Sequence, residues 1–169
     1  IMSGRFFEQL SIPEPHINFG VGSGSQAYQT GQIMMAYENA IAEVRPNLCV
    51  VVGDVTSTMA CTLVAKKAEI KVAHVEGGIR SGDMSMPEEI NRIVTDSISD
   101  YFFTTSKEAS KNLLKQGMKE DQIFFVGNTM IDTLFTQLPN LQKPDFFETL
   151  ELDVKPYLVL TLHRPSNVD

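Results

Sequence analysis

The chain has 169 residues, 43% of them hydrophobic and 21% charged, and a formal net charge of −7. This composition is typical of a globular α/β protein and excludes a disordered tail. The negative charge and the lack of any run of Lys and Arg argue against binding to nucleic acid or to an anionic membrane. No apolar run approaches the ~20 residues that span a bilayer and no signal peptide is recognisable, so we expect a cytoplasmic protein.

Helical and strand patterns alternate along the chain. Helical periodicity is found at residues 32–44, 57–67, 87–97, 106–116 and 129–137. Apolar, β-rich runs are found at residues 48–52, 72–75, 101–104, 123–126 and 157–162. The alternation predicts a Rossmann-like, doubly wound parallel sheet of the α/β class. The runs are apolar at both alternating positions, which predicts strands covered by helices on both faces.

The alternation is interrupted before the last run. Residues 138–156 contain three prolines and an acidic-aromatic patch, which favours a connection between two domains. We therefore expect residues 1–137 to form one domain. Residues 157–169 would then contribute the first strand of a second domain. The chain begins with isoleucine and stops seven residues after the last run, so we expect it to be truncated at both ends.

A glycine-rich segment precedes the first predicted helix. Residues 22–27 fit the dinucleotide-binding pattern G-x-G-x-x-G/A. The residues before this segment are short and polar for a buried strand, and no acid ends a strand about 20 residues later, as ribose recognition requires. The segment is therefore interpreted as a surface or substrate-facing loop, with a nicotinamide site as the less favoured alternative.

Polar residues follow four of the five apolar runs, namely Gly53-Asp54, Glu76, Gly127-Asn128 and His163. In open parallel sheets ligands bind outside the carboxyl ends of the strands, so we expect these groups to share one site. Two alternatives stay open. Asp54 also suits a turn or a helix cap, and Glu76 also suits a structural ion pair with Arg80.

Two further groups are candidates for the same site. Glu88 follows Pro87 in what is also an ordinary helix start, and the loop that leaves Glu76 would carry it across the same edge. His163 is followed by Arg164, and such a polar pair is costly to bury without partners. His163 is therefore a candidate for phosphate contact or proton transfer.

The remaining histidines and the cysteines are expected to be structural. His16 and His74 lack comparable polar neighbours in the sequence. Cys49 and Cys61 stand in apolar surroundings at no metal-ligand or redox spacing, so we expect buried free thiols in a reducing compartment.

Seven short motifs occur in a fixed order along the chain. They are GVGSGS at 20–25, QTG at 29–31, VVGD at 51–54, HVEGGIRSGD at 74–83, MPEEINR at 86–92, VGNTMID at 126–132 and TLHRP at 161–165. In this order they closely resemble the non-hydrolysing UDP-N-acetylglucosamine 2-epimerase family. The resemblance implies two Rossmann-like domains in the glycosyltransferase-B arrangement, with the sugar nucleotide in the cleft between them. It also implies that residues 1–137 are a partial N-terminal Rossmann-like domain whose first strands are missing.

The resemblance also implies the roles of individual residues. Asp54, Glu76 and Glu88 match the carboxylates that are implicated in acid/base catalysis, and His163 matches a residue at the diphosphate and the sugar. Three further side chains are expected to contact the substrate: Arg80, Asn128 and Arg164. No metal is expected.

The implied reaction is the reversible epimerisation of UDP-N-acetylglucosamine to UDP-N-acetylmannosamine at C2, which supplies cell-surface polysaccharide synthesis. UDP is eliminated to form 2-acetamidoglucal and is then added back with protonation from the other face. Neither step needs a redox cofactor. The similar enzymes are homodimers, and Met34, Met35 and Tyr37 widen the apolar stripe of the predicted helix 32–44, so we expect a homodimer.

Other functions stay open as alternatives. They are an epimerase for a related UDP-diacetamido sugar, a hydrolysing epimerase that releases free N-acetylmannosamine, and a glycosyltransferase of the same fold. Three carboxylates at one edge argue against a transferase, because transfer with inversion ordinarily needs a single base. We also expect this chain of 169 residues to be inactive by itself.

Overall fold

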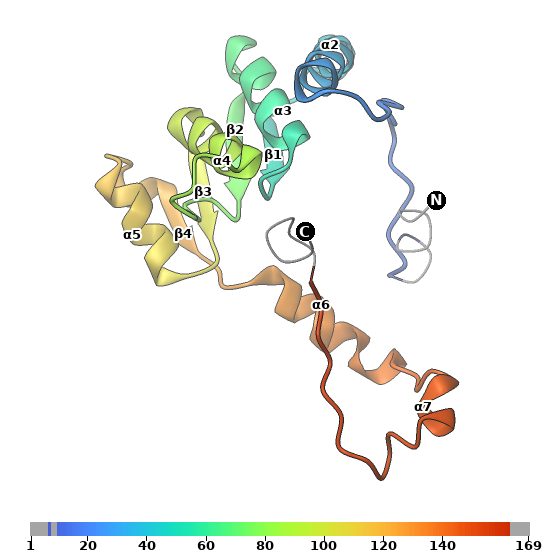
Figure 1. Cartoon of the computed structure of the whole chain (residues 1–169). Coiled ribbons are helices and arrows are strands. Elements are labelled where there is room, and N and C mark those ends of the chain that lie inside the picture. The colour runs from blue at the N-terminus through green and yellow to red at the C-terminus, as the bar shows by residue number, and fades with distance from the viewer. Residues whose placement is uncertain (1–6, 8–9, 163–169) are drawn as a thin grey trace. The chain divides into compact units, whose positions relative to one another are not determined.

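A computed structural model describes residue 7 and residues 10–162 of the chain (Figure 1). The chain divides into two compact units, Ile1–Thr133 and Leu134–Asp169. The first unit contains a β-sheet with its covering helices. Within the described ranges, no helix is long and apolar enough to cross a membrane.

A four-stranded parallel sheet forms the centre of the first unit. Its strands are β1 (Leu48–Val52), β2 (Lys71–Val75), β3 (Tyr101–Thr104) and β4 (Ile123–Phe125), and they lie in the order β1-β2-β3-β4. The crossovers between them are made by α3 (Thr56–Lys67), α4 (Pro87–Ile98) and α5 (Lys107–Lys115), and a 3-10 turn, Glu120–Gln122, leads into β4 (Figure 1). The predicted alternation of helices and parallel strands is confirmed.

Helix α2 (Gln26–Val44) precedes the sheet and packs against α3. It begins earlier than the sequence pattern predicted because Ser25 caps it: the Ser25 hydroxyl accepts a hydrogen bond from the Tyr28 N–H at 3.2 Å. The helix ends before Arg45, whose backbone is left-handed with a φ of 49°. The glycine-rich residues 22–24 thus lead into a helix, and no strand precedes them within residues 10–21, which does not fit a dinucleotide-binding turn.

An apolar core lies between α2, α3 and the first two strands. Its buried members are Ile41, Cys49, Val51, Val64, Ala65, Ile70 and Val72. Met34 and Tyr37 of α2 pack against this cluster, so most of the extra apolar width of that helix is used inside the unit. Burial of these side chains is the main source of stability in this region.

Strand β1 is covered on one face only. Cys49 and Val51 are each 7% exposed, whereas Leu48, Val50 and Val52 are between 44% and 58% exposed. The expectation of helices on both faces is therefore wrong for β1 in the described part of the chain. The reason is the connectivity, because right-handed crossovers between successive neighbouring strands place all their helices on the same face of a sheet.

The residues after the sheet form short helices. These are α6 (Thr129–Gln137), the 3-10 turn Leu138–Asn140 and α7 (Phe146–Thr149). The strand expected at residues 157–162 is not formed, and Leu158 is 99% exposed. A strand is stable only when its backbone N–H and C=O groups pair with a neighbour, and residues 157–162 have no such neighbour within the described ranges. The division into two domains stays a prediction.

Candidate active site

The carboxyl ends of the strands form one edge of the sheet, which we call the carboxyl edge. At this edge the Gly53 N–H donates to the Val75 carbonyl at 3.0 Å, and the Glu76 N–H donates to the Phe103 carbonyl at 2.9 Å. The parallel register therefore continues past the ends of β1 and β2. A Cβ placed on Gly53 would lie only 3.7 Å from Glu76 Oε2, so the Glu76 carboxylate lies beside the residue that precedes Asp54. Asp54 and Glu76 thus leave neighbouring strands at the same edge.

Glu76 has an unusual environment for a carboxylate at the end of a strand. Its backbone is left-handed with a φ of 71°, a conformation that residues other than glycine rarely adopt. The residue is half-buried, and its carboxylate makes no hydrogen bond or ion pair among the described residues. The alternative of an ion pair with Arg80 is therefore not realised, because Arg80 pairs with Asp96 instead.

Asp54 is held by α4 rather than by its own loop. Its carboxylate pairs with Arg92, and its backbone carbonyl accepts a hydrogen bond from Asn91 Nδ2 at 2.8 Å. The residue before α3 is Val55, and no side-chain hydrogen bond caps that helix. The alternative interpretation of Asp54 as a helix cap is therefore not supported.

Glu89 anchors the loop that carries the next carboxylate. It is 1% exposed and accepts hydrogen bonds from the N–H groups of Ser81 at 2.9 Å and Gly82 at 3.1 Å, and from Arg92 Nη1 at 2.9 Å. Burial alone would raise the pKa of Glu89, but these N–H groups and the guanidinium outweigh it and lower the pKa to about 2. Glu88, the predicted catalytic residue, lies one position earlier, half-buried and without a partner in the described part of the chain.

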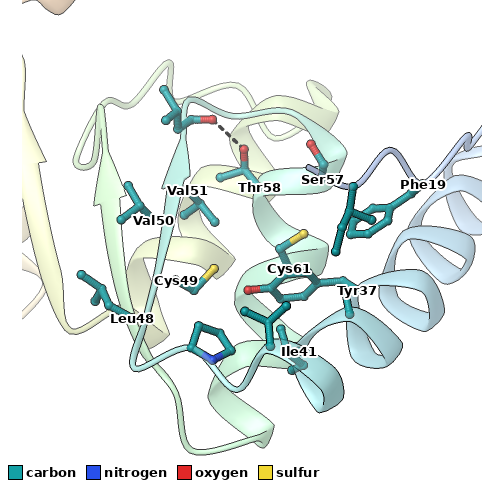
Figure 2. Close-up of a pocket in the computed structure, with 15 residues that line it drawn as sticks. Phe19, Tyr37, Ile41, Leu48, Cys49, Val50, Val51, Ser57, Thr58 and Cys61 are labelled. Carbon is teal, nitrogen blue, oxygen red and sulfur yellow. Dashed lines mark hydrogen bonds between the residues drawn. The ribbon is translucent and has the colours of Figure 1, made fainter. Parts of the chain in front are cut away.

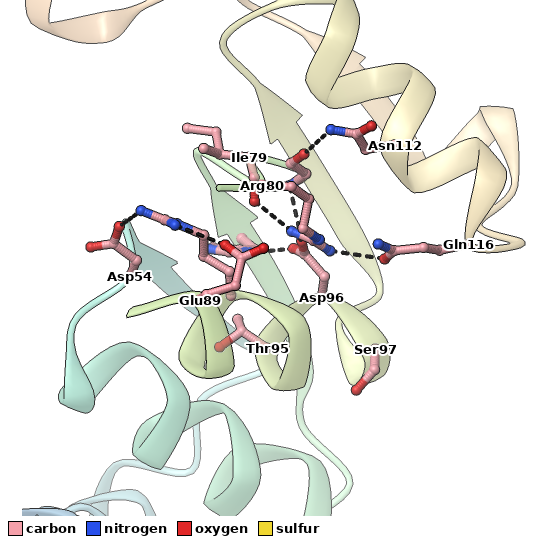
Figure 3. A network of polar contacts seen from close by, with 12 residues as sticks. Asp54, Ile79, Arg80, Glu89, Thr95, Asp96, Ser97, Asn112 and Gln116 are labelled. Atoms are coloured by element: carbon pink, nitrogen blue, oxygen red, sulfur yellow. Dashed lines mark hydrogen bonds and ion pairs between the residues drawn. The ribbon is translucent and has the colours of Figure 1, made fainter. Parts of the chain in front are cut away.

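A second polar cluster lies beneath the exit of β2. Asp96 and His74 are both 0% exposed, and His74 Nδ1 lies 2.6 Å from Asp96 Oδ1. Arg80 Nη1 reaches Asp96 Oδ2 at 2.7 Å, and Arg80 Nη2 donates to Gln116 Oε1 at 2.8 Å (Figure 3). Arg80 is thus engaged by protein groups on two sides. Its predicted contact with substrate stays a prediction.

Sequence analysis missed Glu89, Arg92 and Asp96. The first two stand three residues apart, and a Glu and an Arg at this spacing face each other on a helix. That signal was available in the sequence. Asp96 gave no such signal, because its partners His74 and Gly78 come from a different element and meet it only in the fold.

The remaining predicted site residues lie at the margin of the site or outside the residues that the structure describes. Asn128 is exposed, and its side chain accepts a hydrogen bond from the Met130 N–H at 3.0 Å, at the start of α6. His163 and Arg164 lie outside the described residues. Among the described residues, no group of three or more His, Cys, Asp or Glu side chains could hold a metal ion.

An apolar cavity of about 470 Å³ lies beside β1 and between α2 and α3. Tyr37, Cys49 and Cys61 line it, together with aliphatic side chains of β1 (Figure 2). Both cysteines are free thiols, and burial raises the pKa of Cys61 to about 11. None of the predicted catalytic carboxylates lines this cavity. The predicted catalytic carboxylates therefore lie at the carboxyl edge and not in this apolar cavity.

Comparison with known proteins identifies the relatives of this chain. Residues 1–169 match the family described as UDP-N-acetylglucosamine 2-epimerase. The UDP-N-acetylglucosamine 2-epimerase of Methanocaldococcus jannaschii is 44% identical over 172 residues, which cover 99% of this chain and 47% of that protein. The UDP-2,3-diacetamido-2,3-dideoxy-D-glucuronate 2-epimerase of Pseudomonas aeruginosa is 37% identical, and the match covers 99% of this chain and 47% of that protein.

Solved structures give the same result. The crystal structure of the Methanocaldococcus jannaschii enzyme in complex with UDP-GlcNAc and UDP matches with a TM-score of 0.80 and 42% identity, over 88% of this chain and 41% of that one. The putative enzyme from Listeria monocytogenes matches with a TM-score of 0.81 and 31% identity, over 88% of this chain and 40% of that one. The chain thus spans about half the length of the relatives it matches, and the structural neighbours have a glycosyltransferase-B-like fold.

Proposed function

This chain belongs to the UDP-N-acetylglucosamine 2-epimerase family, and from that premise we propose that the complete polypeptide encoded by its gene interconverts UDP-N-acetylglucosamine and UDP-N-acetylmannosamine. The observation that carries the proposal is the placement of Asp54 and Glu76 on neighbouring strands of the carboxyl edge. The Methanocaldococcus jannaschii relative was crystallised with UDP-GlcNAc and UDP, which supports a UDP-sugar as substrate.

The proposed reaction inverts one carbon without net oxidation. A base removes the proton from C2, the bond between C1 and the UDP oxygen breaks with its electrons going to UDP, and a C1–C2 double bond forms in 2-acetamidoglucal. In the reverse direction UDP adds to C1 and C2 receives a proton from the opposite face. Atoms and electrons balance without a cofactor. The chemistry needs two acid/base groups in different protonation states.

The environments of the three carboxylates suit these demands differently. Asp54 is paired with the guanidinium of Arg92, which suits a base or an electrostatic contact. Glu76 and Glu88 are half-buried and have no partner in the described part of the chain, so both carboxylates are available for contact with a substrate. We propose that Glu76 and Glu88 exchange protons with C2 from opposite sides, and that His163 and Arg164 contact the diphosphate.

Solvent isotope exchange tests this proposal. The complete gene product, supplied with UDP-N-acetylglucosamine in D₂O, should yield the C2 epimer with one deuterium at C2 in both sugars, and should need no added nicotinamide or metal. Epimerisation without deuterium uptake would contradict the elimination route. No epimerisation by the complete gene product would contradict the function itself. The chain of 169 residues assayed in parallel shows what activity it has by itself.

A second candidate substrate comes from one specific observation, the 37% identity to the Pseudomonas aeruginosa UDP-2,3-diacetamido-2,3-dideoxy-D-glucuronate 2-epimerase. Parallel assays with that sugar nucleotide and with UDP-N-acetylglucosamine separate the two candidates by their ratio of kcat/KM. Release of free N-acetylmannosamine in the same assay would instead indicate a hydrolysing enzyme. The higher identity to the Methanocaldococcus jannaschii enzyme favours UDP-N-acetylglucosamine.

We also propose that the complete gene product is a homodimer. Met35 is 54% exposed on α2, beside Met34 and Tyr37, which pack inward. An exposed apolar side chain next to a packed helix face is suited to a subunit contact. Light scattering at micromolar concentration should give twice the monomer mass, and a monomer at that concentration would contradict the proposal.

A further inference from the structure

Two fully buried ionisable side chains take no part in the chemistry proposed above. His74 lies in β2 and Asp96 in α4, both at 0% exposure. Gly77 packs directly on their contact: a Cβ at this position would lie 3.2 Å from Asp96 Oδ1 and 3.4 Å from His74 Nδ1. The two side chains are thus fully buried and closely packed. Burial of two ionisable groups is costly, so their partners indicate what the pair does.

Both ring nitrogens of His74 face hydrogen-bond acceptors. Nε2 lies 2.8 Å from the carbonyl oxygen of Gly53, and because a carbonyl cannot donate, Nε2 carries a proton. Nδ1 lies 2.6 Å from Asp96, whose other oxygen accepts from the Gly78 N–H at 3.0 Å and from Arg80. A carboxylate that accepts from these donors would accept from an N–H at Nδ1 as well. The two contacts together are those of an imidazolium ring, with Asp96 on one side and the end of β1 on the other.

The contacts of this pair fix the two strand exits that carry the proposed catalytic carboxylates. The Gly53 N–H donates to the Val75 carbonyl at 3.0 Å and its carbonyl accepts from His74, so both polar backbone groups of the residue before Asp54 are bound to β2. On the other side, Asp96 accepts the Gly78 N–H and so holds the turn that follows the left-handed Glu76. His74 and Asp96 lie between these two exits.

We propose that His74, held as a cation by Asp96, is a positioning residue that sets the spacing between Asp54 and Glu76. The inference rests on the proposed epimerase function for its effect on rate, but the charge of the ring does not. A misplacement of about 1 Å in a reacting group costs about 10²-fold in rate. Loss of the hydrogen bond to Gly53 should therefore lower kcat, while the remote contacts that set KM stay intact.

Nuclear magnetic resonance of the ring tests the charge directly. The chain has three histidines, so ¹⁵N-labelled histidine with a His74→Gln variant for assignment isolates the signal. We expect one-bond ¹H–¹⁵N couplings at both Nδ1 and Nε2 of His74 at pH 8, and loss of the Nδ1 proton in Asp96→Asn. A ring with a single N–H in the wild-type chain would overturn the inference. This readout needs no turnover, so it stays decisive whatever reaction the complete gene product catalyses.

Two substitutions separate positioning from simple support of the fold. Gln places its amide nitrogen near the position of Nε2 and keeps the bond to Gly53, whereas Asn places it near Nδ1 and keeps the bond to Asp96. In the complete gene product His74→Asn should lower kcat by about 10²-fold at unchanged KM, and His74→Gln should stay within about threefold of the wild type. Equal losses of kcat in the two variants would overturn the positioning role.

Asp100 provides the matched control. It is a partly buried aspartate that pairs with Lys66 at 2.8 Å and accepts the Val72 N–H at 2.7 Å, at the opposite end of the sheet. Asp100→Asn should lower the thermal midpoint without changing kcat per folded molecule, whereas Asp96→Asn should lower both. A kcat loss of similar size in Asp100→Asn would contradict the inference. If neither His74 variant folds, the ¹H–¹⁵N couplings of the wild-type His74 ring decide whether the inference stands.

Discussion

Helices α3 and α4 are neighbours of equal length on the same sheet, yet they are held in opposite ways. The buried residues of α3 are Thr58, Ala60, Thr62, Val64 and Ala65. Those of α4 are Glu89, Asn91, Arg92, Thr95 and Asp96. The hydroxyls of Thr58 and Thr62 are satisfied by the nearby carbonyls of Val52 and Thr58 itself, so α3 offers the sheet an essentially apolar surface. The inner face of α4 is polar throughout.

The difference indicates what each helix contributes. Apolar packing is non-directional, so α3 mainly stabilises the fold, although Thr58 also binds the Val52 carbonyl near the carboxyl edge. The polar face of α4 costs desolvation energy and returns defined geometry, because each hydrogen bond specifies a distance and a direction. All of the contacts made by α4 with Asp54, Ser81 and Gly82 are of this kind. We infer that α3 supplies stability and α4 supplies the geometry of the carboxyl edge.

Replacement of Glu76 by Gln in the complete gene product should have the largest effect. Gln keeps the shape of the side chain but cannot exchange the proton, so kcat should fall by about 10²–10⁴-fold. The thermal midpoint should hardly change, because the Glu76 carboxylate has no partner within the described ranges. Parallel measurement of the epimerisation rate, UDP affinity and thermal midpoint checks this. A destabilised variant with nearly full activity would show that Glu76 is structural.

Gly78→Ala should give the largest loss of stability among substitutions next to the polar contacts of α4. A Cβ on Gly78 would lie 2.3 Å from the Ala109 carbonyl oxygen, and the φ of 82° is unfavourable for alanine. The clash is with backbone of α5, which cannot rotate away, so we expect a loss of about 3 kcal/mol or more in the free energy of unfolding. Gly31→Ala in α2 is the matched control: no atom lies within 4 Å, so helix propensity should make it stabilising by about 0.5–1 kcal/mol.

Acid should weaken α4 before it weakens α3. Because the pKa of Glu89 is lowered from 4.5 to about 2, its contribution is fully present above pH 4.5 and is lost as the pH falls towards 2. The free energy of unfolding should fall by about 3 kcal/mol, since one pKa unit corresponds to about 1.4 kcal/mol. Urea unfolding between pH 7 and pH 2.5 measures how steeply the free energy of unfolding falls with pH. This fall should be shallower in Glu89→Gln. An identical slope in that variant would show that other carboxylates dominate.

Val64→Ala should have the smallest effect of the four. It removes two methyl groups from the apolar core around Ile41 and Val51, which should cost about 2 kcal/mol in the free energy of unfolding. The kcat of the complete gene product per folded molecule should stay unchanged, because no polar contact at the carboxyl edge passes through Val64. A clear fall in kcat would contradict the separation of roles between α3 and α4.

Most of the fold was accessible from the sequence. Strands β1 and β3 have the predicted bounds, and α6 was predicted over its whole length. The reason is that periodic apolar residues report which face of an element is buried without reference to any distant residue. The motifs of the family were likewise sufficient to identify it, because their joint order leaves little room for coincidence.

Three features depended on the assembled fold. They are which strand faces are exposed, whether residues 157–162 pair as a strand, and which polar groups contact one another. The exposure of Val50 and the absence of a strand at residues 157–162 depend on which elements are present as neighbours. The pairing of Arg80 with Asp96 rather than with Glu76 depends on the path of the turn after β2. Sequence periodicity encodes burial, which is a property of one element, whereas a hydrogen bond needs two atoms within about 3 Å and therefore depends on the arrangement of several elements at once.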